Sequence, residues 1–113
     1  MPSAGIERLG ITKLTSAVAF GSGGTTAFTA TDNFLVSVIA SNSVSTEGSI
    51  YIYVIPSGAT TTAEYGLIAY SLPLSGYNSY ETFRFAMKNN DLLKVAGSAG
   101  VSFYVQGIDQ VTA

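Results

Sequence analysis

Hydrophobic and polar positions alternate most clearly in residues 49–55, a run bounded by Gly48 and Pro56. Nearly every residue there is β-branched or aromatic, the types that fit a pleated strand. Side chains alternate along a strand, so one face is purely aliphatic and the other carries two phenol groups. The first face has Ile50, Ile52 and Val54, and the second has Tyr51, Tyr53 and Ile55. A strand that is apolar on both faces is typical of a sheet interior or of a sheet covered by another element.

Short alternating runs separated by turn residues continue along the chain, which is the pattern of an all-β sandwich or barrel. The other expected strands are residues 26–31, 34–40, 64–72, 80–87, 92–96 and 101–108. Strands of this kind bury one face by packing two sheets together. We therefore predict a single antiparallel β-sandwich, jelly-roll or immunoglobulin-like, of about seven or eight strands.

Two of these strands carry specific expectations. In residues 64–72, the alternation places Ile68, Tyr70 and Leu72 on one face, and Pro73 ends the strand because proline cannot donate to a ladder. Residues 80–87 alternate as one continuous strand. The inward set is Phe83, Phe85 and Met87, and the outward set is Thr82, Arg84 and Ala86.

The first 24 residues have no clear period. Residues 1–10 contain one proline and two glycines and predict an extended arm. In residues 11–20, spacings of three and four leave a short helix open, but poor helix formers favour extended structure. Residues 21–24 (GSGG) predict a flexible turn rather than a phosphate loop, since no Gly-Lys-Ser/Thr follows. The expected division is an arm with its turn at 1–24 and a β-sandwich domain at 25–113.

Charged residues make up 11% of the 113-residue chain, against roughly 25% in an ordinary soluble domain. The net charge of −2 argues against a nucleic-acid partner. Two interpretations remain open: a neutral surface rich in hydroxyl groups, or a surface partly covered by copies of the chain or by a larger assembly. We favour the second. No stretch approaches the roughly 20 apolar residues of a membrane span, and we expect no secretory signal.

Catalytic chemistry is not indicated. The chain has neither cysteine nor histidine, which removes disulfides, thiolate metal sites and the usual general base. The seven carboxylates are scattered through arm, loops and strand ends, and show neither a calcium-loop spacing nor a paired-acid arrangement. We therefore expect no enzyme, no cofactor and no metal site.

The seven tyrosines leave three roles open: sheet packing, a subunit interface, or a sugar-stacking surface. Tyr77 and Tyr80, which flank a loop, form the expected exposed pair.

Residues 34–110 resemble a family of small β-sandwich virion proteins of tailed bacteriophages, particularly phages of cyanobacteria. The resemblance rests on strand-and-turn patterns, and Arg8, Leu9 and Gly10 resemble the leading arm of the family. Residues 27–30 (AFTA) depart from the Tyr-Thr-Val-Pro pattern that members often show. The matching stretches are 36–42 (VSVIASN), 50–59 (IYIYVIPSGA), 65–70 (YGLIAY), 90–95 (NDLLKV) and 101–107 (VSFYVQG).

The resemblance implies a structural role in the virion, without catalytic residues. The leading hypothesis is a capsid decoration or cement protein, a homo-oligomer (a trimer is expected) bound to the major capsid protein or other virion proteins. Residues 2–14 would be its anchoring element. A neck, tail or fibre component and a glycan-binding receptor module are the alternatives. The expected interface residues are Ile6, Arg8, Leu9, Ile11, Leu14, Tyr51, Tyr53, Tyr77 and Tyr80.

Overall fold

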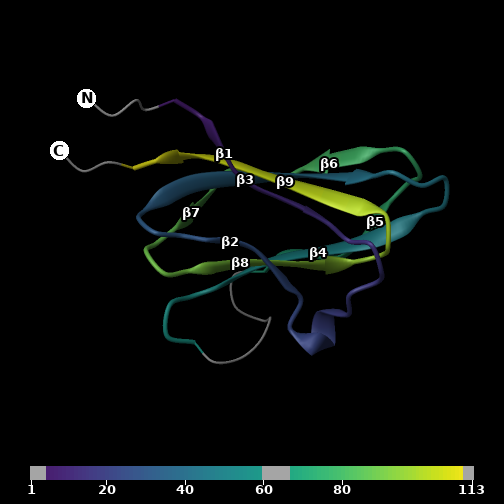
Figure 1. The fold of residues 1–113 in the computed structure, drawn as a ribbon, viewed down its shortest axis with the longest axis horizontal. Helices are drawn as coiled ribbons and strands as arrows, with labels where there is room; N and C mark the ends of the chain where they lie inside the picture. Colours follow the sequence, from purple (N-terminus) through teal and green to yellow (C-terminus); the bar gives the residue numbers. More distant parts are fainter. Residues whose placement is uncertain (1–4, 60–66, 111–113) are drawn as a thin grey trace.

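The computed structural model describes residues 5–59 and 67–110, which fold into two antiparallel β-sheets packed face to face (Figure 1). The predicted all-β sandwich is confirmed. The five-stranded sheet contains β1 (Glu7–Lys13), β9 (Val101–Asp109) and β3 (Phe34–Asn42) in that order, with β6 (Ser79–Glu81) and β7 (Phe85–Met87) both paired to the far side of β3. The four-stranded sheet has the order β2 (Thr25–Thr29), β8 (Leu92–Gly97), β4 (Gly48–Ile55) and β5 (Leu67–Leu74). A short 3₁₀ turn, η1 (Phe20–Ser22), precedes β2.

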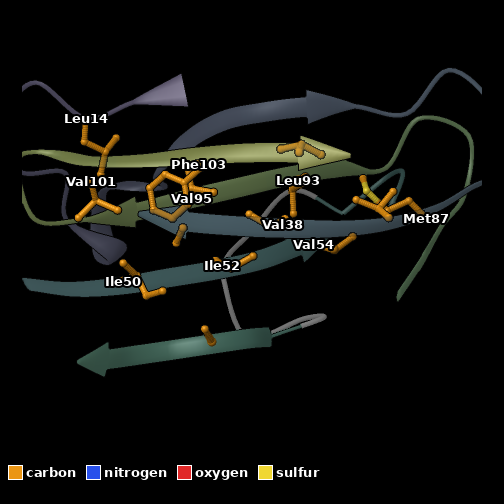
Figure 2. Close-up of a cluster of buried hydrophobic side chains, with 14 of the residues drawn as sticks. Leu14, Val38, Ile50, Ile52, Val54, Met87, Leu93, Val95, Val101 and Phe103 are labelled. Atoms are coloured by element: carbon orange, nitrogen blue, oxygen red, sulfur yellow. The ribbon is translucent and has the colours of Figure 1, made fainter. Parts of the chain in front are cut away.

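The core lies between the two sheets and is built from the inward positions of the alternating strands. In β3, Val36, Val38 and Ala40 are completely buried, and Phe103 of β9 lies among them. Figure 2 shows this cluster, with Val38, Ile52 and Phe103 in the space between the layers. The aliphatic face predicted for residues 49–55 is this core face of β4.

The second face of β4 is also covered, as the sequence predicts. Strand β4 is interior to its sheet, between β8 and β5. On its outer side, Tyr53 and Ile55 form a separate buried cluster with Phe20 of η1 packed on it. Phe20, the last residue of the segment predicted to be extended, therefore helps to close the outer face of the four-stranded sheet, just before the predicted turn at residues 21–24.

Most of the described part of the predicted arm is a strand of the sandwich. Strand β1 pairs with β9 along its length, with a register shift between Arg8 and Gly10. Leu14, directly after β1, is buried in the core. Residues 7–14 thus belong to the folded domain rather than to a separate arm. The predicted division at residue 24, between an arm and the β-sandwich, does not separate them from the sandwich. Residues 2–4 of the predicted anchor lie outside the described residues.

The predicted strand 80–87 is interrupted. Residues 82–84 leave the ladder between β6 and β7, and this break reverses two orientations. Thr82, expected outward, is buried, while Phe83, expected in the core, is 91% exposed. Phe85 and Met87 do pack inward. The break and the additional strand β1 raise the number of strands to nine among the described residues.

Strand β5 corrects two further expectations. Pro73 lies within the strand instead of ending it, since β5 is an edge strand where a missing N–H group is tolerated. The register with β4 shifts between Ile50 and Ile52, so Tyr70 and Ser71 together face Tyr51 in a bulge. Tyr70 is consequently exposed, although Leu72 packs against the core. Positions 60–66, including the expected start of this strand, lie outside the described residues.

Candidate functional site

The outward side of the five-stranded sheet carries aligned apolar side chains. Ile11 of β1 lies opposite Tyr104 of β9, which lies opposite Ile39 of β3. Closer to the other end of the sheet, Ile108 lies opposite Leu35. We call these five residues the outer apolar face. Leu35, Ile39 and Tyr104 alternate with buried residues along their strands and therefore point away from the core, and pairing places Ile11 and Ile108 on the same side.

Polar and charged groups interrupt this face only in part. Between its two rows, Gln106 donates a hydrogen bond from Nε2 to Ser37 Oγ at 3.1 Å. Arg8 lies opposite Gln106, and Glu81 of β6 lies opposite Ile39. A depression of about 50 Å³ opens beside them, lined by residues that include Ile6, Leu35, Glu81, Arg84 and Ile108. The face thus combines aliphatic groups with a few charges of both signs.

Phe83 projects into solvent from a rigid attachment. The preceding residue, Thr82, donates its N–H to the Val38 carbonyl at 3.0 Å, and its Oγ1 accepts the Val38 N–H at 3.0 Å. These two bonds hold the break between β6 and β7 against the middle of β3. An exposed phenyl ring on a fixed backbone loses little freedom on binding, which makes it a good anchor for a partner.

The outer side of the four-stranded sheet carries a second candidate surface, an aromatic cluster of Phe20, Tyr51, Tyr53 and Tyr70. Phe20 stacks on Tyr51 with ring centroids 5.0 Å apart. It meets Tyr53 and Tyr70 edge to face, each at 5.2 Å. Tyr51 and Tyr70 also meet edge to face, at 5.3 Å. Tyr70 is 61% exposed, so this cluster reaches the surface at the edge strand β5.

Tyr53 is the buried member of the aromatic cluster, and its hydroxyl has no hydrogen-bond partner. Its side chain is 1% exposed. Burial raises the pKa of the Tyr53 hydroxyl above its ordinary value, because the phenolate would lose its hydration. The Tyr53 hydroxyl therefore stays protonated at neutral pH, and its ring serves to pack the cluster.

One carboxylate has a perturbed environment. The Oδ1 atom of Asp109 is buried and has no hydrogen-bond partner. Loss of hydration on burial raises the pKa of the Asp109 carboxyl, and the nearby carboxylate of Asp32 raises it further through its negative charge and a side-chain hydrogen bond. Glu7 adds a smaller repulsion. Among the described residues, no three acidic side chains gather in a way that could hold a metal ion. No helix in residues 5–59 and 67–110 is long and apolar enough to cross a membrane.

The expected interface residues divide by burial. Ile6, Arg8, Ile11 and Tyr77 are exposed, and Leu9, Tyr51 and Tyr80 are half-buried. Leu14 and Tyr53 are buried, and both are corrections. Leu14 fills the core and Tyr53 is the buried member of the aromatic cluster, so neither can contact a partner of the folded chain. Tyr77 is 72% exposed, but Tyr80 packs against the core, so the expected exposed pair is reduced to one residue.

Within residues 5–59 and 67–110, three exposed aromatic residues were not among the expected interface residues: Tyr70, Phe83 and Tyr104. Tyr104 could have been found, since it occupies an outward position of a strand whose alternation is clear. The exposure of Tyr70 depends on the bulge in β5, and that of Phe83 depends on the break at Thr82. Neither irregularity has a local sequence signal.

No protein-family model matches the chain, and neither a curated protein nor a solved structure matches it.

Proposed function

We propose that the chain is a structural protein of a virus particle, a decoration or cement subunit that attaches through the outer apolar face and Phe83. The observation that carries the proposal is the alignment of Ile11, Tyr104 and Ile39 across three adjacent strands. Phe83, on the segment that follows β6 at the edge of the same sheet, adds a phenyl ring that is almost fully exposed. The low charge of the chain and its resemblance to small virion proteins of tailed phages support the same role.

The anchoring element differs from the one that the sequence alone indicates. Residues 7–13 pair with β9, so wrapping a neighbouring subunit would require this ladder to break. They contribute Arg8 and Ile11 from the outward side of the strand instead. Attachment then requires no refolding of these residues, and the interaction comes from burying apolar surface at about 25 cal/mol per Å².

The outer apolar face is available to two kinds of partner in this proposal. We propose that copies of the chain form a small homo-oligomer, a trimer in our hypothesis, and that the assembly binds the major capsid protein in the virion. A weak contact for each copy is sufficient, because an oligomer engages several subunits of the shell at once. A neck, tail or fibre position would use the same surface against a different virion protein.

The test measures binding of the purified chain to undecorated capsids of the phage that carries the gene. We expect the wild-type protein to sediment with capsids and Phe83→Ser to bind about 30-fold more weakly, the loss typical of an aromatic anchor worth about 2 kcal/mol. Tyr70→Ser, which removes an exposed ring from the opposite sheet, is the matched control and retains binding. Equal binding by Phe83→Ser, Ile11→Ser and the wild type would exclude the outer apolar face, and binding to tails but not to capsids would exclude the decoration role.

A further inference from the structure

A second depression lies on the opposite sheet, beside the aromatic cluster. It has a volume of about 360 Å³, and its lining includes Glu47, Ser49, Ser71, Pro73 and Ser98. We call it the serine depression. The depression is shallow and largely open to solvent, so a ligand would contact it along one side. Its lining is rich in hydroxyl groups, with one carboxylate and no basic side chain.

The polar groups of the serine depression are held in place by the fold. Ser98 Oγ accepts the Ser49 N–H at 3.0 Å, and the Ser98 N–H donates to the Ser49 carbonyl at 3.1 Å. The hydroxyl proton of Ser98 therefore stays available to a ligand. The loop before Glu47 is fixed by the buried amide of Asn42, whose Nδ2 donates to the Thr46 carbonyl at 2.9 Å. A ligand would thus meet an arrangement that already exists.

The bulge in β5 joins this depression to the aromatic cluster. Ser71 has a φ of 48°, a left-handed conformation that is uncommon outside glycine, and it directly follows Tyr70. On the neighbouring strand, Ser49 and Tyr51 are two residues apart on the same outward face, about 7 Å along the strand. On both β4 and β5, a tyrosine ring of the aromatic cluster therefore lies next to a serine hydroxyl of the depression.

We propose that the serine depression binds a neutral saccharide, with the exposed ring of Tyr70, which directly precedes the lining residue Ser71, packing on the part of the sugar that extends beyond the depression. A sugar presents both apolar C–H groups, which pack on a ring, and hydroxyl groups, which donate to carboxylates and exchange hydrogen bonds with serines. The Glu47 carboxylate would accept hydrogen bonds from sugar hydroxyls. The three serines of the lining would both donate to and accept from them. An anionic ligand is disfavoured, because the lining offers a carboxylate and no cation to balance a second negative charge.

This site is independent of the proposed attachment surface, since it lies on the other sheet. A subunit fixed to a particle through the five-stranded sheet would leave the four-stranded sheet free to contact glycans.

The test titrates the full-length protein, labelled with ¹⁵N, with glucose, galactose, mannose, N-acetylglucosamine and disaccharides of these sugars. We expect saturable amide shifts confined to Ser49, Ser71, Ser98 and their neighbours for at least one sugar. Glu47→Gln, which keeps the size of an exposed side chain, and Tyr70→Ala should each weaken that binding tenfold or more. Phe83→Ser is the matched control and should bind the sugar as the wild type does.

Three results would overturn the proposal: no saturable shifts with any of these sugars, shifts centred elsewhere on the molecule, or unchanged affinity in both variants. Tighter binding of sialyllactose or inorganic phosphate than of every neutral sugar would also overturn it, because the depression would then select negative charge. The capsid assay with Phe83→Ser separates this outcome from a failure of the proposed virion role, since the two assays use variants of opposite sheets.

Discussion

Replacing Tyr53 with phenylalanine should stabilise the protein. The ring of Tyr53 is packed by Phe20 and almost completely buried, but its hydroxyl has no hydrogen-bond partner. A buried polar group without a partner costs about 1–3 kcal/mol relative to its hydrated state. Tyr53→Phe keeps the ring and removes this cost, while the missing oxygen leaves only a very small gap. We expect a net gain of about 1–2 kcal/mol, or an increase of about 4–8 °C in the melting temperature of a domain this size.

The measurement is equilibrium unfolding in urea, with thermal unfolding followed by circular dichroism. Tyr51→Phe is the matched control: it removes a hydroxyl from a half-buried ring of the same cluster and should change stability little. The pH dependence gives a second readout. Burial raises the pKa of folded Tyr53 above about 10, so the folded state holds this proton after the unfolded chain has lost it. Wild-type stability should therefore fall as the pH rises above about 10, and Tyr53→Phe should lose this part of the decline.

A loss of stability in Tyr53→Phe that is absent in Tyr51→Phe would refute this reasoning, because it would mean that the hydroxyl of Tyr53 contributes a favourable interaction. An equal gain in both variants would also refute it, since the effect would then not depend on burial.

Three further substitutions test other buried polar groups. Asn42→Ala should lower the free energy of unfolding in urea by about 2 kcal/mol or more, because its amide satisfies carbonyl groups of two loops; an unchanged value would mean that water replaces the amide. Thr82→Val should cost about 1–2 kcal/mol and speed hydrogen exchange of the Val38 amide, which loses its acceptor; protection equal to wild type would contradict the role of this bond. Asp109→Asn should raise the melting temperature at pH 7 but not near pH 3. The raised pKa of Asp109 means that the folded carboxyl keeps its proton to a higher pH than the unfolded one, so wild-type stability falls as pH rises through this range. If Asp109→Asn melts at the same temperature as the wild type at both pH values, the ionised Asp109 carboxylate does not destabilise the fold through burial and repulsion from Asp32.

The regular strands could be predicted from the sequence because their alternation is a local property. Strand β4 is the clearest case: Ile52 lies in the main core and Tyr53 in the second cluster, on the two faces that the sequence assigns. For the second face, the sequence left a central position in the sheet and a covering element open as alternatives, and it did not identify Phe20 as the covering residue. Phe20 lies 31 positions before Tyr51 in the chain, and only the folded structure brings their rings together.

The irregular positions could not be predicted for a related reason. Strand β1 has a register shift next to Gly10, which breaks the period of two that identifies a strand. The sequence from Tyr80 to Met87 alternates well enough for one strand, yet Thr82 bonds to the backbone of Val38 and forces Phe83 outward. Phe83, Tyr70 and Ser71, which we propose as functional, lie at such irregularities, where long-range contacts override the local pattern. The outer apolar face, in contrast, lies at positions that pair in regular register.

The irregular edges of both sheets also have a consequence for aggregation. A long, straight edge strand offers unpaired N–H and C=O groups to another chain, and proteins commonly block this with charged side chains. This chain has few charges. Its edges are instead interrupted: β1 and β2 have register shifts, β6 and β7 are three residues each, and β5 combines a bulge with Pro73. Many copies could therefore be held at high local concentration without joining through their sheets, because the irregular edge strands limit the pairing that charge repulsion prevents in other proteins.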